Sequence, residues 1–194
     1  MKTALLLISY QNDFFPNGRM ALEKSLEAAS RAQEALQLFR VNKLPIIHLQ
    51  HMSTRPDDIH FLPCTRGVDF YPNLRPLKNE TIIRKHYPNC FRDTTLKNFL
   101  KKNKIEHLIL CGMMTHLSVD ATVRAAYDLG FGCTVLQDAC ATKSLEFNGT
   151  TISSDTVQNA FLAALQPLYA EVITTRELLT RTSRRQSQPV AIPA

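Results

Sequence analysis

Residues 108–122, LILCGMMTHLSVDAT, decide the fold class of this chain. The apolar residues Leu108 to Leu110 are typical of a buried strand, and Gly112 permits a tight backbone turn. The pattern then predicts a helix that begins near Ser118 and continues to Leu129. Free backbone N–H groups at such a helix start favour a developing oxyanion. The stretch therefore predicts a strand, a turn and a helix that present a catalytic side chain.

Short apolar segments alternate with helix-like segments along the rest of the chain. This alternation predicts right-handed crossovers and an α/β fold, a doubly wound, Rossmann-like parallel sheet of about six strands with helices on both faces. The expected strands are Thr3 to Ser9, Pro45 to Gln50, Thr81 to Lys85, His107 to Cys111, Cys133 to Gln137 and Glu171 to Thr174. The expected helices are Ala21 to Asn42, Thr94 to Asn103, His116 to Leu129 and Thr156 to Leu165.

Three polar positions follow the carboxyl ends of different expected strands. Ligands of open parallel sheets bind beyond these ends, near the point where the strand order reverses. We therefore expect Ser9, Lys85 and the turn before Ser118 to converge on one site. The long, proline-rich connection at 51–79 is expected to fold over it.

Composition indicates one domain and argues against several functions. The chain has 194 residues and no apolar run near the roughly 20 residues that cross a bilayer, and its start does not resemble a cleaved signal. We expect a cytoplasmic protein without membrane contact. The formal charge of +6 owes much to Arg181, Arg184 and Arg185 near the end of the chain, and without interleaved aromatics it does not predict nucleic-acid binding. Reduced thiols, not disulfides, are expected for the five cysteines Cys64, Cys90, Cys111, Cys133 and Cys140.

Three segments resemble one enzyme family. CGMMTHLSVDATVRAAYDLGF at 111–131 looks like the nucleophile segment of the isochorismatase-like cysteine hydrolases. ALLLISYQNDFF at 4–15 resembles the first strand of that family, and TIIRKHYPNCFRDTTL at 81–96 resembles its lysine segment. The similarity covers about residues 3–179.

The resemblance implies a site with an altered triad. Ser9 stands where the family usually has Asp, Lys85 matches the usual Lys, and Ser118 stands where the family usually has Cys. A cis peptide between Met113 and Met114 is also implied, forming an oxyanion hole with Ser118. The implied substrate-binding residues are Gln11, Asp13, Phe14, Tyr87 and His116. The family further implies a small-molecule substrate, no cofactor, and a homodimer or homotetramer.

The altered triad leaves three interpretations open. A thiol has a pKa near 8.5 whereas a serine hydroxyl is far less acidic, so a simple exchange of Cys for Ser nearly silences the usual reaction. The chain is then a catalytically degenerate protein that binds a small molecule. Alternatively, it is a hydrolase of C–N or related bonds in which Ser118 is the nucleophile, Lys85 a neutral base and Ser9 a relay. The third interpretation is an engineered trap of an ordinary cysteine hydrolase.

Each of these residues also has a structural interpretation. Lys85 can extend to solvent, Ser118 can cap a helix, and Ser9 can be a filler whose hydroxyl is satisfied by the backbone. Asp13 is expected to hydrogen-bond within the loop after the first strand. Cys90 is a candidate substitute thiol, although a plain buried or rim thiol is favoured.

A metal site is not expected. Four histidines lie near the second and third strands, but their spacing does not reproduce an Asp-x-His metal motif. They are His48, His51, His60 and His86.

The sequence predicts a domain boundary near residue 179. Residues 1–179 are expected to form the α/β domain, and 180–194 a tail with no helix or strand of its own. In this hypothesis Val190 and Ile192 dock in a groove of a neighbouring subunit, and Arg184 and Arg185 meet carboxylates at its rim.

Overall fold

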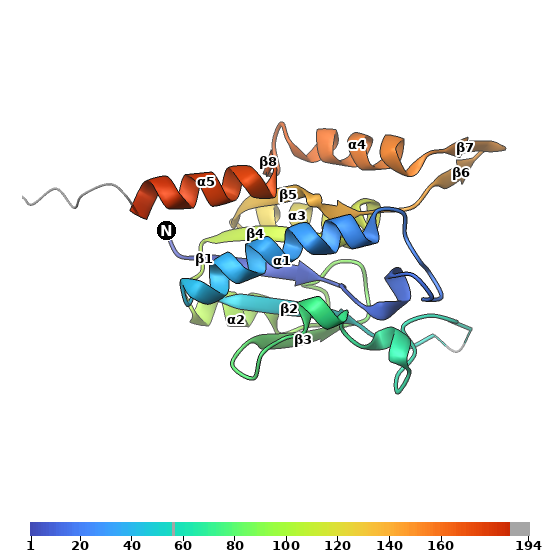
Figure 1. Ribbon diagram of the computed structural model, residues 1–194, viewed down its shortest axis with the longest axis horizontal. Helices are drawn as coiled ribbons and strands as arrows, with labels where there is room; N and C mark the ends of the chain where they lie inside the picture. The colour runs from blue at the N-terminus through green and yellow to red at the C-terminus, as the bar shows by residue number, and fades with distance from the viewer. Residues whose placement is uncertain (56, 187–194) are drawn as a thin grey trace, which may run out of the picture.

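A parallel sheet forms the centre of the protein. The computed structural model describes residues 1–55 and 57–186 and shows six strands in the order β3-β2-β1-β4-β5-β8 (Figure 1). They are β1 (Thr3–Ile8), β2 (Ile46–His51), β3 (Thr81–Lys85), β4 (His107–Met113), β5 (Gly132–Ala141) and β8 (Glu171–Ile173). All neighbouring pairs are parallel, so the strands end at one edge. The predicted doubly wound α/β fold is confirmed.

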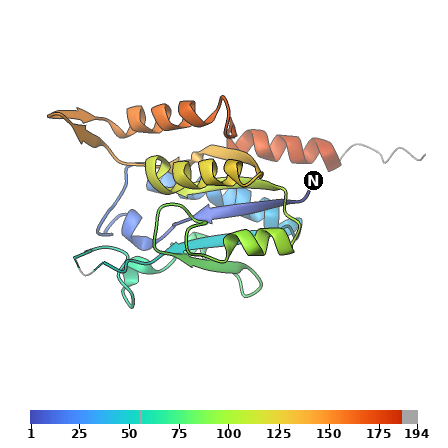
Figure 2. The same cartoon turned by 180° about the vertical axis from the view of Figure 1, so that it is seen from behind.

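Helices cover both faces of this sheet. The helices are α1 (Ser25–Val41), α2 (Leu96–Lys102), α3 (Asp120–Asp128), α4 (Ser154–Leu165) and α5 (Thr175–Gln186). In Figure 1, α1 and α5 lie in front of the sheet, and Figure 2 shows α2 and α3 in front of the opposite face, with α4 at the top of both views. None of the helices in the described ranges is long and apolar enough to cross a membrane.

The central strands are apolar throughout because both of their faces are covered. Leu5 and Leu6 of β1 and Leu108 and Leu110 of β4 are fully buried. Gly112 lets β4 approach β1 closely, since a Cβ there would lie 2.2 Å from the carbonyl oxygen of Ile8. Between β1 and β4 the strand order reverses, and a ligand site is therefore expected at the carboxyl ends of these two strands.

The second half of the chain departs from the predicted elements. The helix expected from His116 is a π-helix, η4 (Thr115–Val119), continued by α3. A hairpin of β6 (Leu145–Phe147) and β7 (Thr150–Ile152) was not expected, and it projects beyond the sheet in Figure 1. Its three-residue strands are too short to show a clear alternating pattern in the sequence.

The sequence predicted no helix from Thr180 onward, but α5 continues to Gln186, so this prediction is wrong for residues 180–186. Leu178 anchors α5 in the core, and the hydroxyls of Thr180 and Thr182 donate to carbonyl oxygens one turn earlier. This packing outweighs the weak helix propensity of the segment. The expected docking residues Val190 and Ile192 lie outside the described residues, as do the side chains of Arg184 and Arg185.

Candidate functional site

The segment after β4 carries Ser118. The Met113–Met114 peptide bond is cis, as the resemblance implied. The π-helix η4 begins directly after it, and the N–H groups of Leu117 and Val119 both donate to the Met114 carbonyl, at 3.1 and 3.2 Å. Thr115 ties this segment to α4, because its hydroxyl donates to the side-chain oxygen of Gln158. Ser118 is thus held on a fixed, short segment beside the reversal point of the sheet.

Lys85 meets Ser118 across the end of the sheet. Lys85 Nζ lies 3.0 Å from Ser118 Oγ and donates to the Tyr87 carbonyl at 3.1 Å. Lys85 ends β3, whereas Ser118 follows β4, and β2 and β1 lie between these strands. The contact therefore joins groups from two strands that are not neighbours in the sheet, and the segment after β4 contributes to closing the gap. Lys85 and Ser118 thus lie together, as the sequence predicted.

Lys85 is a buried amine without a carboxylate partner. Its exposed fraction is 0%, and none of the described carboxylates forms an ion pair with it. Burial lowers the pKa of Lys85, and the nearby Cys90 opposes this shift only in part. Burial thus disfavours the charged ammonium relative to a lysine in water, and loss of a proton leaves a lone pair on the amine that can accept one.

Ser9 lies at the end of β1 with an unpaired hydroxyl. It adopts a left-handed backbone conformation with φ 55°, and its N–H donates to the Leu49 carbonyl at 2.9 Å. The side chain is 1% exposed, and Oγ has no hydrogen-bond partner in the part of the chain that the structure describes. The structural interpretation in which the backbone satisfies this hydroxyl is therefore wrong.

Gln11 and Asp13 use their side chains to fix neighbouring backbone. Gln11 donates to the carbonyls of His51 and Val68 and accepts from the His51 N–H, at 2.7 to 2.8 Å. Asp13 accepts from the N–H groups of Phe61 and Arg19, at 2.6 and 3.2 Å. These bonds give Asp13 the structural role that the sequence favoured. Binding of substrate by Gln11 or Asp13 stays a prediction.

The other expected substrate contacts lie around this edge. Phe14 packs edge-on against Phe61, with ring centroids 4.7 Å apart. The Arg92 guanidinium lies 3.6 Å from the ring centroid of Tyr87. His116 shares a hydrogen bond with the Thr142 hydroxyl, and burial lowers the pKa of this histidine.

Cys90 is a buried thiol. It is 0% exposed, and burial raises its pKa although the Lys85 charge opposes this. Its role as a substitute nucleophile is thus disfavoured at neutral pH. In the described ranges, no group of three or more His, Cys, Asp and Glu side chains is placed to hold a metal ion.

His51 is a site neighbour that the sequence reasoning considered only as a metal ligand. It pairs in register with Lys85, and burial together with the Lys85 charge lowers its pKa to about 3. The imidazole is neutral at physiological pH, and Nδ1 is buried without a partner among the described residues. The sequence could have indicated this position, because His51 ends the strand that neighbours the Lys85 strand.

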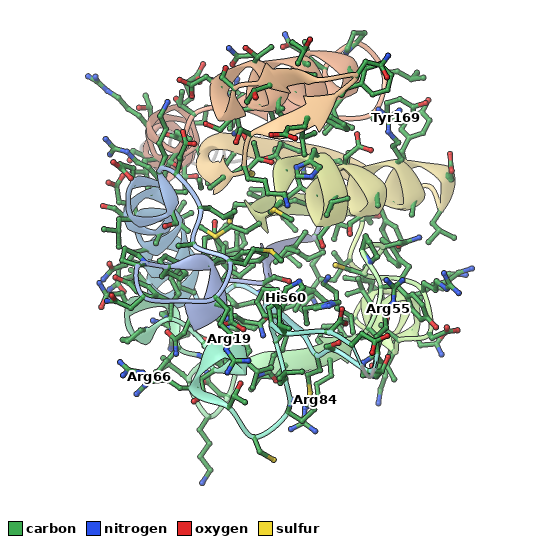
Figure 3. The ribbon with its side chains drawn as sticks, turned by 90° about the vertical axis from the view of Figure 1, so that its right-hand side faces the viewer. Arg19, Arg55, His60, Arg66, Arg84 and Tyr169 are labelled. Carbon is green, nitrogen blue, oxygen red and sulfur yellow. The ribbon has the colours of Figure 1, made fainter. Side chains whose placement is uncertain are left out.

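Basic side chains surround the same edge of the protein. Figure 3 looks onto the ends of the strands and labels Arg19, Arg55, Arg66 and Arg84, with His60 among them. The four arginines are exposed and carry no ion pair to a described carboxylate. Four exposed arginines therefore lie at the edge of the sheet that carries the site.

Comparison with known proteins identifies the relatives of this fold and site. The isochorismatase domain matches residues 3–177. The uncharacterized isochorismatase family protein YddQ of Bacillus subtilis is 44% identical over 180 residues, which are 92% of this chain and 99% of that protein. Streptothricin hydrolase of Streptomyces noursei is 29% identical over 139 residues, covering 72% of this chain and 49% of that enzyme.

Solved structures give the same result. An isochorismatase-type hydrolase from Oleispira antarctica has a TM-score of 0.88 at 41% identity, covering 92% of this chain and 96% of that one. An isochorismatase from Pseudomonas putida has a TM-score of 0.85 at 32% identity, covering 90% and 89% of the two chains. With its fold, its Lys85 segment and its cis peptide after β4, this chain belongs to the isochorismatase family.

Proposed function

We propose that this protein hydrolyses C–N bonds of small amides, with Ser118 as nucleophile and Lys85 as general base. The observation that supports this most is the 3.0 Å separation of Lys85 Nζ and Ser118 Oγ, in a buried place where Lys85 meets no carboxylate. Hydrogen-bond reach of about 2.6 to 3.2 Å is the first requirement of a nucleophile and its base. The second is a suitable pKa, and burial moves that of Lys85 downward.

The proposed reaction has two stages. Lys85 accepts the Ser118 proton as Oγ attacks the amide carbonyl, and the resulting ammonium then gives this proton to the leaving amine. Water next hydrolyses the acyl–serine, with Lys85 again as base. Backbone N–H groups of the turn at Met113 and Met114 are the proposed oxyanion donors. Streptothricin hydrolase, a relative by sequence, supports a hydrolytic reaction.

The experiment is an activity screen with small amides, nicotinamide and isochorismate. Turnover by the unmodified protein should be lost in Ser118→Ala and retained in Ser25→Ala, a matched change of a buried serine in α1. If Ser118→Ala keeps full activity, Ser118 is not the nucleophile.

The second candidate is a degenerate enzyme that binds a small molecule without turnover. The unpaired Ser9 hydroxyl favours it, because Ser9 stands where the family resemblance places a carboxylate. In that case the unmodified chain is inactive, and activity appears only in the double change Ser9→Asp with Ser118→Cys. The same screen thus separates the two candidates.

A further inference from the structure

The buried amine of Lys85 suggests a chemical modification of this site. Lys85 Nζ contacts one hydroxyl and one carbonyl oxygen, and the nearby Ser9 position supplies no carboxylate. We propose that Lys85 reversibly binds carbon dioxide as a carbamate, which supplies the carboxylate that this chain lacks at residue 9. Carbamate formation does not require the protein to turn over a substrate. Only the effect of the carbamate on activity rests on the proposed function.

The reaction needs no oxidant or other co-reactant. The nitrogen lone pair of the neutral amine attacks the carbon of CO₂, and one C=O π pair moves to oxygen. A proton leaves the nitrogen for water, so the product is –NH–COO⁻ plus one H⁺. A protonated amine has no lone pair for this step, and the lowered pKa of Lys85 therefore supports it.

The contacts of Lys85 match the polar groups of a carbamate. The carbamate keeps one N–H, which can continue to donate to the Tyr87 carbonyl, now 3.1 Å from Nζ. Its two oxygens are acceptors, and the Ser118 hydroxyl, which lies 3.0 Å from Nζ, is the proposed donor for one of them. We propose the Ser9 hydroxyl as donor for the other, because it follows β1 at the same edge of the sheet and has no partner among the described residues. A buried hydroxyl without a partner is costly, and an acceptor of this kind removes the cost.

No negative charge beside Lys85 opposes an anion there. Its titratable neighbours are the buried Cys90 thiol and the neutral His51 imidazole, and neither brings a negative charge. The exposed arginines of Figure 3 add positive potential at the same edge of the sheet. A carbamate next to Ser118 would accept the nucleophile's proton, as a carboxylate does in the family's usual triad.

The direct test is carbon NMR of the full chain in bicarbonate labelled with carbon-13. Besides any signal from the exposed N-terminal amine, we expect a protein-bound carbamate signal that is absent in Lys85→Met and retained in Lys24→Met, which changes an exposed lysine. Lys85→Arg serves as a second variant that keeps a long polar side chain and cannot form the carbamate. A folded, unmodified protein that gives no such signal, or a signal that persists in both Lys85 variants, overturns the proposal.

Two further arms separate this inference from the proposed function. Ser118→Ala should keep the carbamate signal while losing amide hydrolysis, so a signal without turnover supports the modification and refutes only the hydrolase. In an active protein, removal of dissolved CO₂ should lower kcat/KM by about tenfold or more, and bicarbonate should restore it. Activity that is identical with and without CO₂ would show that the carbamate is not the base.

Discussion

The protein buries ionisable side chains at both ends of β3, around Glu80 before its start and around Lys85 at its end, and the two clusters differ in whether charges of opposite sign are paired. Glu80 accepts from Arg40 at 2.6 and 2.9 Å, from the Leu77 N–H at 2.9 Å and shares a 2.8 Å bond with His48. Lys85, five residues later, contacts a hydroxyl and a carbonyl and no charge of opposite sign.

The pairing decides what each cluster can do. Burial alone would raise the pKa of Glu80, but its hydrogen bonds lower it to about 2, and burial lowers the pKa of His48. Both groups therefore keep one protonation state at physiological pH. Burial instead lowers the pKa of Lys85 below its ordinary value, and no carboxylate among the described residues opposes the shift. The Glu80 cluster therefore stabilises the fold, whereas Lys85 is the residue to which we assign chemistry in the proposed function.

The largest effect is expected from a change that removes the Lys85 amine but keeps a long, unbranched side chain. In Lys85→Met we expect kcat/KM for amide hydrolysis to fall by about 10³-fold, because a general base typically contributes 10²- to 10⁴-fold. The free energy of unfolding should be equal or higher, since folding then no longer removes an amine from water. Steady-state kinetics and urea unfolding check the two parts. A large loss of stability together with activity would show that Lys85 is mainly structural.

A change in the Glu80 cluster should lower the free energy of unfolding without changing the rate of hydrolysis. Glu80→Gln leaves Arg40 and His48 without their buried partner, and we expect a loss of about 3 kcal/mol in the free energy of unfolding at pH 7. Hydrolysis by the folded fraction should be unchanged. Glu106→Gln, at an exposed glutamate, is the control. A lowered kcat at full folding would contradict the separation of the two clusters.

The two clusters should shape the pH dependence of stability in two different pH ranges. The lowered pKa of Glu80 stabilises the fold above about pH 4.5, and this contribution is lost as the pH falls toward 2. The lowered pKa of Lys85 makes the unfolded chain bind more protons, so stability rises with pH up to the ordinary value of 10.5. Urea unfolding across pH should lose the acid slope in Glu80→Gln and the alkaline slope in Lys85→Met. Unaltered slopes in the variants would assign these dependences to other groups.

The smallest effect is expected from an exposed ion pair. Lys24 and Asp155 are paired at the surface, where water screens the interaction. Asp155→Asn should leave both the urea midpoint and kcat/KM unchanged within error. A lower urea midpoint or a lower kcat/KM in this variant would mean that burial is not what separates the Glu80 and Lys85 clusters from an ordinary surface ion pair.

The sequence predicted the sheet well because its strands are buried on both faces and therefore apolar throughout. It also placed Lys85 and Ser118 at one edge, since parallel strands end together. It did not predict the clusters, because the partners of Glu80 come from α1 and β2, far away in the chain. The unpaired state of Ser9 depends on its left-handed backbone, which no residue type there signals. The extent of α5 depended on the tertiary packing of Leu178.

The position of β3 at the edge of the sheet makes the Lys85–Ser118 contact a tie between two separate parts of the fold. Lys85 ends the outermost strand, whereas Ser118 follows β4 in the middle of the sheet, and β2 and β1 lie between these strands. One flank of β3 carries no further strand in the described ranges. The proposed base and nucleophile are thus 33 residues apart in the chain, and they meet only when the whole parallel sheet has formed.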